Sequence, residues 1–415
     1  MMHLPKSLRS FCLTGFLCFQ VLLLTGCPAP KRAVRDARPI QPDEIRPLND
    51  DASNQIPTQP VGESKETSNP AASITELPSE ISDPDGELAT GVKKPADPAS
   101  FPSVDVSVMT WNLEWFFDNE TEDNKPGLQV EKSAPDRASW DWRRDAVAKA
   151  IDQAKPDIMA FQEIEGQQVL YYLSRALDRN HKLKFSDAFI QGRDFFTGQD
   201  VGFLYRDTVD LTQSGRFNQS RDMKQSKQYW SVSKHAFARF AIPTPDGPRF
   251  LFVVNLLLRS SPEGEVQRTR QARTVHYYIA DLVRAGQNVI VLGDTNTELL
   301  DDAELQSTDI GALTGLDTPD TEDDLIDLHS RLPEDQRATH LLNKQFDRIL
   351  VSPSVLEDDP DAYDISFAGI KNLKSLATPG GVDEPQEHWD NYWTMPEDQR
   401  DLSDHWPLVL RLKVK

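Results

Sequence analysis

Residues 289–296 read Val-Ile-Val-Leu-Gly-Asp-Thr-Asn, so a run of apolar residues ends abruptly in a polar turn. A continuous apolar run of this kind is typical of a strand that is buried on both faces. The aspartate and the asparagine stand two residues apart, so their side chains can point into the same cleft. The segment therefore predicts a buried strand that brings Asp294 and Asn296 to one edge of a sheet.

Four other apolar segments also end, or begin, with polar residues that an apolar run does not predict. These polar residues are Asn112 after 104–111, Gln162 and Glu163 after 158–161, Asn255 after 250–254, and Ser403, Asp404 and His405 before 406–414. A single polar residue at a strand end is more often part of a turn or a helix cap. The pattern is informative because several strands of one chain share it.

Segments with helical spacing lie between these strands. Apolar side chains recur at intervals of three and four in 142–154, 167–178 and 265–285, and further strands are expected at 201–205 and 346–351. Strands that alternate with helices predict an α/β domain. We expect a loop at 117–139 and a long surface insertion at 357–400, because both segments are rich in proline and acidic residues without clear periodicity.

The N-terminal quarter of the chain has a different composition. In residues 1–27, Lys6 and Arg9 precede a mostly apolar run, which predicts an export signal too short to span a bilayer. Residues 28–103 are rich in Pro, Ser, Thr and acidic residues, so they cannot bury enough apolar surface to fold and predict a disordered tether. The folded domain is expected to cover residues 104–415.

The export signal ends in Leu-Thr-Gly-Cys at residues 24–27, which resembles the lipobox of bacterial lipoproteins. The resemblance implies cleavage before Cys27, lipid modification of that cysteine, and an exported protein anchored in the cell envelope. The protein would then lie at the outer membrane, on its periplasmic or surface side. The alternative is an ordinary signal peptide with a chance cysteine. Cys12 and Cys18 lie in the segment that would be removed, so the mature chain could form no internal disulfide.

The polar strand ends, in this order and at these spacings, resemble the endonuclease/exonuclease/phosphatase superfamily, which has the DNase I-like fold. The most specific part is the pairing of Gly-Asp-x-Asn at 293–296 with Ser-Asp-His at 403–405, with Asp-Arg-Ile at 347–349 between them. The match runs through nearly all of 104–415. It implies a four-layer sandwich, in which two facing mixed β-sheets are flanked by helices and the active site lies between the sheet edges.

The resemblance also implies a hydrolase that cleaves a phosphate ester with a divalent metal, Mg²⁺ or Mn²⁺. Glu163 offers a carboxylate oxygen and Asn112 an amide oxygen, and both suit magnesium. By the resemblance these two residues form the metal site. Asp404 resembles a residue that contacts the metal directly or through water.

His405 is the candidate general base, because imidazole exchanges a proton near neutral pH. By the resemblance, Asp347 hydrogen-bonds and orients this histidine, as the carboxylate does in a catalytic triad. Asp294 would position or activate the attacking water, and Asn296 would donate to the phosphate. Asn255 belongs to the same phosphate-binding side.

One position departs from the family pattern. The family usually reads Asn-x-His-Leu-x-Ser after this strand, whereas residues 255–260 here read Asn-Leu-Leu-Leu-Arg-Ser. Leu257 therefore stands where a histidine would donate to the scissile phosphate or the leaving oxygen. Three interpretations stay open: Arg259 supplies the positive charge, a histidine from elsewhere such as His235 or His340 reaches the site, or the protein binds a phosphorylated ligand without cleaving it.

The chain is strongly acidic, with 45 basic and 66 acidic residues and a formal net charge of −21. Residues 1–103 hold 10 basic and 13 acidic residues, so 35 basic and 53 acidic residues, a net −18, belong to 104–415. Such a surface repels polyphosphate at long range and argues against a long nucleic-acid groove, although a bound metal can dominate the local field. The substrate stays open between a nucleic acid, as in a nuclease, and a phosphorylated small molecule or lipid headgroup. We expect a monomer.

Overall fold

The computed structural model describes residues 103–125, 127–189, 192, 196–297, 308–356, 364–378 and 391–415. The predicted export signal with Cys27, and the predicted tether apart from residue 103, lie outside the described residues. Of the helices in the described part, none combines the length and the apolar character that crossing a membrane requires.

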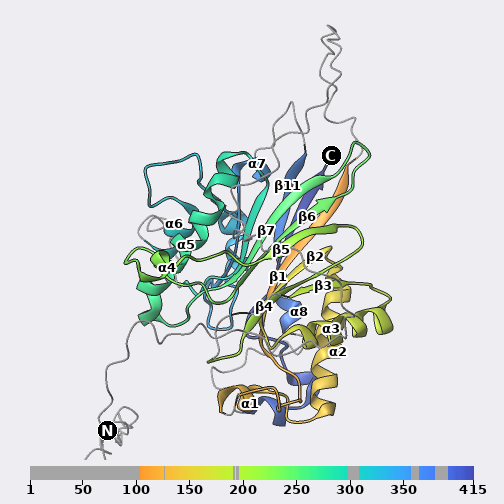
Figure 1. Cartoon of the computed structure of the whole chain (residues 1–415). Helices are drawn as coiled ribbons and strands as arrows, with labels where there is room; N and C mark the ends of the chain where they lie inside the picture. The colour runs from red at the N-terminus through yellow and green to blue at the C-terminus, as the bar shows by residue number, and fades with distance from the viewer. Residues whose placement is uncertain are drawn as a thin grey trace, which may run out of the picture. The chain divides into compact units, whose positions relative to one another are not determined.

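Two six-stranded sheets lie at the centre of the fold (Figure 1). Sheet A has the order β11 (Ile365–Asn372), β12 (Leu408–Val414), β1 (Val104–Phe116), β2 (Ile158–Ile164), β4 (Asp200–Tyr205) and β3 (Ser186–Phe189). Sheet B has the order β5 (Asp210–Gly215), β6 (His235–Ile242), β7 (Arg249–Leu257), β8 (Val289–Asp294), β10 (Asp347–Val351) and β9 (Ile326–Asp327). Both sheets are mixed, because β1 pairs with β2, and β7 with β8, in parallel, while their other described neighbours are antiparallel.

A helix connects the two strands of each parallel pair. The helix α2 (Arg137–Ala154) joins β1 to β2, and α5 (Glu265–Arg284) joins β7 to β8. Figure 1 shows α2 and α3 (Gln167–Ala176) on one side of the sheets, and α5 and α6 (Asp309–Thr314) on the other. The predicted four-layer sandwich of two facing mixed sheets flanked by helices is therefore confirmed.

The remaining helical segments are short. They are α1 (Leu128–Lys132), α4 (Arg221–Gln225), α7 (Pro353–Leu356), α8 (Lys374–Ala377), a π-helical turn at Leu177–His181, and 3₁₀ turns at Pro262–Gly264, Leu328–Arg331, Glu334–Gln336, Tyr392–Thr394 and Glu397–Gln399.

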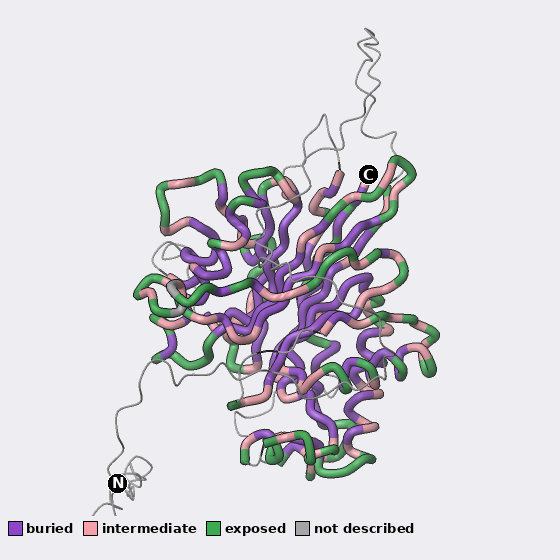
Figure 2. The backbone as a smooth tube through the Cα atoms, in the orientation of Figure 1, coloured by how far each residue is buried: buried purple, intermediate pink, exposed green. Residues whose placement is uncertain are grey.

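Three apolar clusters hold these layers together, and Figure 2 shows the strands of both sheets as mostly buried. The largest cluster lies between the sheets and includes Val108, Ala160 and Val253. A second packs α2 and α3 onto sheet A, and a third packs α5 onto sheet B. Each fully buried aliphatic side chain stabilises the fold by about 1.5–3 kcal/mol, so the strands are fixed rigidly in relation to one another.

Two expected loops contain regular structure. The insertion expected at 357–400 is wrong in part, because Ile365–Asn372 form β11, the edge strand that pairs with β12; residues 357–363 and 379–390 lie outside the described residues. A register shift between Phe367 and Gly369 interrupts its alternation, which hid the strand. The expected loop at 117–139 contains α1 and the start of α2, where the Asp136 side chain accepts a hydrogen bond of 2.8 Å from the Ser139 amide.

Candidate functional site

The inward-facing row of each central strand is apolar for most of its length and polar at one end. In β1 this row passes from Val106 and Val108 to Asn112, and in β8 from Ile290 and Leu292 to Asp294. These ends meet because β7 and β8 run in parallel, and because the antiparallel strands β10 and β12 begin where β8 and β1 end. One end of the sandwich therefore gathers the predicted polar residues.

His405 lies at the centre of this gathering. Its Nδ1 is 2.7 Å from Asp347 Oδ2, and its Nε2 is 3.8 Å from Asp294 Oδ2 and 3.9 Å from Asp404 Oδ1. Burial by itself lowers the pKa of His405, but the charges of Asp347, Asp294 and Asp404 together raise that pKa well above its usual value. The imidazole is thus oriented at Nδ1, while its Nε2 edge faces two further carboxylates.

The turn that carries His405 is fixed by groups from β1. Ser403 Oγ donates to the Asn112 carbonyl at 2.7 Å and accepts from the His405 amide at 3.0 Å. Glu114 Oε2 accepts from the Asp404 amide at 3.0 Å. The Ser-Asp-His segment is therefore held by its backbone, which leaves the side chains of Asp404 and His405 to face the site.

His340 lies against this turn, with its ring centroid 4.7 Å from that of His405. Its Nδ1 accepts a hydrogen bond from the Leu342 amide at 3.0 Å, and its Nε2 is 3.2 Å from Asp404 Oδ2. Because Nδ1 accepts, the neutral ring carries its proton on Nε2 and donates it to Asp404. The ligand atoms of His340, Asp404 and His405 lie within 4.8 Å of one another, but His340 in this tautomer has no lone pair at Nε2 for a metal.

Asn112 connects two carboxylates. Its Nδ2 donates to Glu163 Oε1 at 3.2 Å and to Asp294 Oδ2 at 3.0 Å, while its Oδ1 accepts from the Glu114 amide at 2.9 Å. The amide oxygen that was predicted to bind a metal accepts one backbone hydrogen bond in this conformation, which leaves its second lone pair for a metal. The reason is local: Glu114 and Trp115 adopt positive φ angles of 44° and 53°, which turn the chain back onto Asn112.

The carboxylates at this end repel one another. Burial raises the pKa of Glu163, and the charge of Asp404 raises it further. Burial also raises the pKa of Asp294 to about 7, in spite of the nearby His405. A divalent cation would relieve this excess of negative charge, and carboxylate oxygens are ligands that magnesium prefers. Glu163, Asp294 and Asp404 therefore have the charge and the ligand chemistry that a divalent metal needs, although among the described residues only His340, Asp404 and His405 bring three ligand atoms within 4.8 Å of one another.

The Gly-Asp-x-Asn turn needs its glycine. Gly293 has a φ of 130°, and a Cβ atom there would lie 2.1 Å from the Leu256 carbonyl oxygen, so β8 can approach β7 only without a side chain. Asn296, with a φ of 52°, donates from its backbone N–H to Asp294 Oδ1 at 2.8 Å. Its Nδ2 donates to Asp294 Oδ2 and to the Leu258 carbonyl, each at 3.1 Å. Backbone strain of this kind is frequent at functional sites.

Asn255 lies further inside the sandwich than the carboxylates of the site, and its environment differs from the one expected for a residue that binds phosphate. It is fully buried, and its Nδ2 donates to the carbonyls of Phe161 and Gly202, each at 3.0 Å. Its Oδ1 accepts from Gln162 Nε2 at 2.6 Å. Both amide hydrogens are thus used, and Asn255 joins sheet B to sheet A.

Leu257 is 5% exposed and belongs to the apolar cluster between the sheets. Arg259 follows the strand as an exposed residue whose stem lies against Gly264, since a Cβ atom on Gly264 would be 2.8 Å from Arg259 Cγ. His235 is fully buried, with Nδ1 2.8 Å from the Val232 carbonyl and Nε2 accepting from the Phe217 amide at 2.9 Å. Of the two histidines considered from the sequence, His340 reaches the site and His235 does not.

Two residues at the site carried no signal in the sequence. Gln199 Nε2 donates to Glu163 Oε2 at 2.5 Å, and Lys234 Nζ donates to Gln199 Oε1 at 2.9 Å. Each is an isolated polar residue directly before a strand. It belongs to no sequence motif or periodic pattern that would predict its place in the site. A third residue, Arg143 of α2, is fully buried and donates to the carbonyls of Leu113 and Glu114, which supports the strained end of β1.

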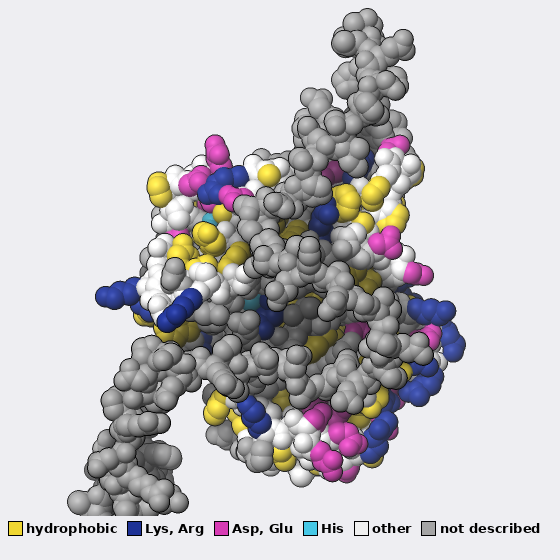
Figure 3. Space-filling model, viewed as in Figure 1, with side chains coloured by type: hydrophobic (Ala, Val, Ile, Leu, Met, Phe, Trp, Pro, Cys, Tyr) yellow, Lys and Arg dark blue, Asp and Glu magenta, His cyan; other side chains and the backbone are white. Residues whose placement is uncertain are grey.

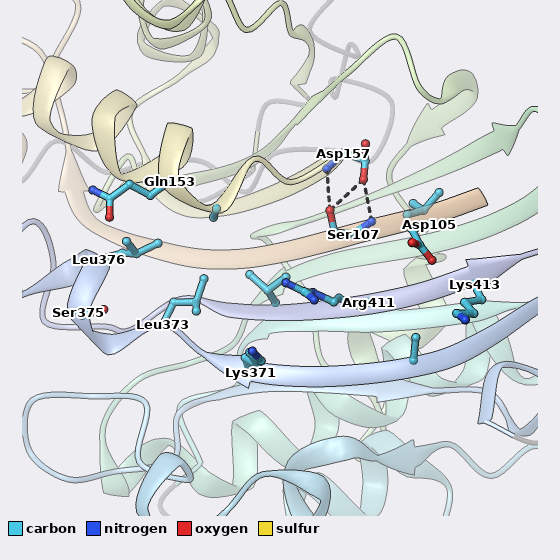
Figure 4. A pocket seen from close by; sticks show the side chains of 14 residues that line it. Asp105, Ser107, Gln153, Asp157, Lys371, Leu373, Ser375, Leu376, Arg411 and Lys413 are labelled. Carbon is cyan, nitrogen blue, oxygen red and sulfur yellow. Dashed lines mark hydrogen bonds between the residues drawn. The ribbon is translucent and has the colours of Figure 1, made fainter. Parts of the chain in front are cut away.

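A separate groove lies on the outer face of sheet A, between the ends of α2 and α8 (Figure 4). It displays Arg411 and Lys413, but Lys413 stands opposite Asp105 in the strand register. Asp157 in this groove accepts hydrogen bonds from the backbone and the hydroxyl of Ser107. The described lining contains no histidine and mixes both charges, so the strand-end cluster is the better candidate for an active site.

A family model described as the Endonuclease/Exonuclease/phosphatase family matches residues 109–405. No curated protein sequence gives a match.

Similar solved structures include humanized D. rerio TDP2, with 18% identity over 74% of this chain and 98% of that chain and a TM-score of 0.45. An endonuclease/exonuclease/phosphatase from Bacteroides vulgatus has 18% identity, coverage of 75% and 100%, and a TM-score of 0.45. The catalytic domain of human Nocturnin, solved with a bound sulfate anion, has 14% identity, coverage of 76% and 98%, and a TM-score of 0.46.

Proposed function

The chain belongs to the endonuclease/exonuclease/phosphatase family, whose members are generally hydrolases of phosphodiesters or phosphate esters, and we propose that it hydrolyses a phosphate ester with a divalent metal. The observation that carries the proposal is the environment of His405. The ring is held at 2.7 Å by Asp347 and turns its Nε2 toward Asp294 and Asp404. This is the arrangement that an oriented general base requires.

The proposed metal is Mg²⁺ or Mn²⁺, held by Glu163, Asp404 and Asp294. When bound, it would supply positive charge where the phosphate oxygens gain negative charge. Asn112 would donate from its Nδ2 to Glu163 and Asp294 and fix them, and its Oδ1 would keep one lone pair for the ligand role that its sequence position predicts. Gln199 would hold the other oxygen of Glu163.

The protein side chains would then manage the proton. His405 Nε2 would take a proton from the attacking water, and the water oxygen would form a bond to phosphorus as the bond between phosphorus and the ester oxygen breaks. The ester oxygen would leave with the electron pair of that bond and take up a proton from water. Asp347 keeps the proton of His405 on Nδ1, so that Nε2 stays the accepting atom. A metal held by Asp294 and Asp404 would offset their negative charges and so would remove part of the cause that raises the pKa of His405.

A second candidate function rests on Leu257. A leucine can neither donate a hydrogen bond nor carry charge, so the protein could bind a phosphorylated ligand without cleaving it. Under this alternative, the buried carboxylates of the site, which repel one another, would serve ligand binding alone. The enzyme is the better explanation, because a base oriented by Asp347 contributes to proton transfer and not to affinity.

The substrate class and the location are also part of the proposal. On the face in Figure 3, the described Lys and Arg side chains lie in separate groups, some of them next to Asp and Glu side chains, which does not favour a continuous track for a long nucleic acid. A short phosphodiester or a phosphorylated small molecule or lipid headgroup fits this surface better. We place the monomeric enzyme in the cell envelope, anchored through Cys27 to the membrane.

The test is an assay of the purified chain on bis(p-nitrophenyl) phosphate, p-nitrophenyl phosphate and plasmid DNA, with Mg²⁺, Mn²⁺ or a chelator. We expect turnover that requires the metal and is abolished in His405→Ala. If no substrate is turned over under any of these conditions while inorganic phosphate still binds, the binding function replaces the enzymatic one.

A further inference from the structure

The position of Leu257 in sheet B determines which side chain can replace the missing histidine. Strands β6 and β7 are antiparallel with His235 opposite Leu256, so the next pair is Lys234 and Leu257. The Leu257 amide donates to the Lys234 carbonyl at 3.0 Å, which confirms this register. Residues that stand opposite each other in an antiparallel pair share a face, with Cβ atoms about 4.5–5.5 Å apart.

The shared face is the inner one. Ala236 and Ala238, which follow Lys234 at intervals of two, belong to the apolar cluster between the sheets, as does Leu257 itself. Side chains alternate along a strand, so Lys234 leaves β6 on the side of the site. The half-buried lysine is therefore the cross-strand neighbour of the position that lacks a histidine.

The ammonium group of Lys234 ends beside the carboxylates. Its Nζ donates to Gln199 Oε1 at 2.9 Å, and Gln199 Nε2 donates to Glu163 Oε2 at 2.5 Å. Two hydrogen bonds thus separate the positive charge from Glu163. A phosphate bound by a metal on Glu163 would come within reach of this ammonium, because lysine is a point charge on a flexible four-carbon stem.

The other candidates for the missing positive charge lie elsewhere. Arg259 is exposed beyond the end of β7, with its stem against Gly264. His235 uses both ring nitrogens in hydrogen bonds beside Phe217. His340 donates to Asp404, on the side of the general base. Of these four residues, Lys234 alone pairs directly with Leu257.

We infer that Lys234 binds a non-bridging oxygen of the substrate phosphate and takes over the charge-stabilising role that a histidine at position 257 would have. This inference rests on the proposed function, because it assumes that a phosphate group occupies the site. An ammonium in this position stabilises the negative charge that develops on the phosphate oxygens during hydrolysis. The ligand class is an anionic phosphate ester; the inference makes no distinction between its alcohol groups.

The first experiment removes the charge with Lys234→Met and measures kcat/KM on bis(p-nitrophenyl) phosphate with Mn²⁺. We expect a loss of at least about 100-fold, as for the removal of one donor to a developing oxyanion, and a loss below tenfold in Lys234→Arg. The matched control is Arg239→Met on the same strand, whose guanidinium carbon lies 3.9 Å from the centroid of the Phe250 ring and away from the site. That control should stay within twofold of the wild type.

The second experiment tests replacement directly. Leu257→His alone should change kcat/KM by less than threefold, but in the Lys234→Met background it should restore at least tenfold. A thermal melt of each variant checks that the histidine is accommodated at this buried position. If Leu257→His gives the same gain in both backgrounds, Lys234 does not fill the role and the inference is overturned.

A structural role through Gln199 has a different signature. If Lys234 acted by holding Gln199 and Glu163, Lys234→Met would weaken Mn²⁺ binding, and Gln199→Leu would reproduce the whole loss of activity. We expect Mn²⁺ affinity within threefold of the wild type in Lys234→Met, measured by calorimetry. A parallel loss of Mn²⁺ affinity and kcat/KM would overturn the inference.

A binding measurement separates this inference from the proposed function. Inorganic phosphate is titrated into the Mn²⁺-loaded wild type, Lys234→Met and Arg239→Met. If the wild type turns over no substrate, the proposed hydrolysis fails, but Lys234 is still supported when Lys234→Met weakens phosphate binding at least tenfold. Equal phosphate affinity in the wild type and in Lys234→Met overturns the inference whether or not the wild type is active.

Discussion

The two sides of the candidate site are built differently. On the base side, Asp347, Asp404 and His405 lie within hydrogen-bonding or ion-pair distance of one another or of a further polar partner. On the phosphate side, the Leu257 side chain offers no polar atom, and among the described residues the cation is Lys234, which lies directly before the neighbouring strand β6. A histidine base must have one defined tautomer and point its free nitrogen at the water, whereas any cation that reaches a phosphate oxygen can stabilise its negative charge. The phosphate side can therefore change its residues more freely than the base side.

The largest effect that this comparison predicts is for Asp347→Asn. An asparagine amide can donate to Nδ1 of His405, which moves the ring proton to Nε2 and leaves no lone pair for the water proton. We expect kcat to fall about 1,000-fold, which is about 4 kcal/mol in the barrier. The measurement is steady-state hydrolysis of bis(p-nitrophenyl) phosphate, with the exposed Asp105→Asn as the control. A loss below tenfold would mean that the base side is as replaceable as the phosphate side.

Asn255→Ala should affect stability more than chemistry. The substitution leaves the buried carbonyls of Phe161 and Gly202 and the Gln162 amide without their present partner. Each buried polar group that loses its partner costs about 1–3 kcal/mol, so we expect the free energy of unfolding in urea to fall by about 3 kcal/mol. At temperatures where the variant is folded, kcat/KM should change less than tenfold. A large loss of kcat/KM at unchanged stability would instead place Asn255 against the phosphate, as its sequence position suggests.

Metal binding should depend on the base side and the adjoining Glu163, and not on Lys234. Mn²⁺ at about 100 times its dissociation constant should stabilise the folded wild type by about 2.7 kcal/mol. Glu163→Gln should lose most of this stabilisation in a thermal melt, because it removes the charge of a candidate ligand, while Lys234→Met should keep it. If Glu163→Gln is stabilised as much as the wild type, the metal lies elsewhere.

A buried histidine in the 3₁₀ turn Leu328–Arg331 offers a second contrast with the base side. His329 is 4% exposed, neither of its ring nitrogens has a hydrogen-bond partner among the described residues, and burial and Arg348 lower its pKa to about 4. The ordinary pKa of histidine is about 6.5, so between pH 6.5 and pH 4 His329 is protonated in the unfolded chain and neutral in the folded chain. This group therefore adds stability above pH 6.5 and loses it as the pH falls.

The resulting prediction concerns acid stability. Between pH 7 and pH 5 the His329 contribution to the free energy of unfolding should fall by about 2 kcal/mol. His329→Leu should remove that part of the pH dependence, as measured by urea unfolding at both pH values. An unchanged difference between pH 7 and pH 5 would show that other groups cause the acid sensitivity.

The sequence predicted the strands and the polar residues at their ends because both depend on local chemistry. The Gly-Asp-x-Asn turn is an example: Gly293 must lack a side chain for β8 to approach β7, and that requirement is visible as a motif. The alternation of strands and helices predicted an α/β domain, and the family resemblance implied its four-layer architecture. Strand β11 was missed because a register shift interrupts its alternation.

The finer details of the site depend on distant parts of the chain and could not be predicted. The sequence places Asn112 and Asn255 correctly at strand ends. The orientation of the Asn112 amide depends on the nearby Glu114 amide and also on carboxylates 51 and 182 residues away. The orientation of the Asn255 amide depends on partners 53 to 94 residues away. Lys234 is a single cation whose importance comes from the strand register with Leu257. Contacts of this kind leave no periodic signal in a sequence.

The smallest effect predicted for the base side concerns His340. Its Nε2 donates to Asp404 while its Nδ1 accepts from the Leu342 amide, so the ring fixes one oxygen of a candidate metal ligand. Groups that orient metal ligands typically contribute about 10–100-fold to metal affinity. Because Asp404 is also held through its backbone by Glu114, we expect the lower figure, a tenfold loss or about 1.4 kcal/mol, for Mn²⁺ binding to His340→Ala.

His340→Gln distinguishes this positioning role from simple packing. The glutamine amide can still donate to Asp404, so it should restore Mn²⁺ affinity to within threefold of the wild type, whereas His340→Leu fills the space without donating and should resemble alanine. If leucine restores affinity as well as glutamine does, His340 acts by packing against His405 and Phe346. In that case the hydrogen bond from His340 to Asp404 adds nothing to the metal affinity. The metal would then be held by Glu163, Asp294 and an Asp404 that is fixed by its backbone alone.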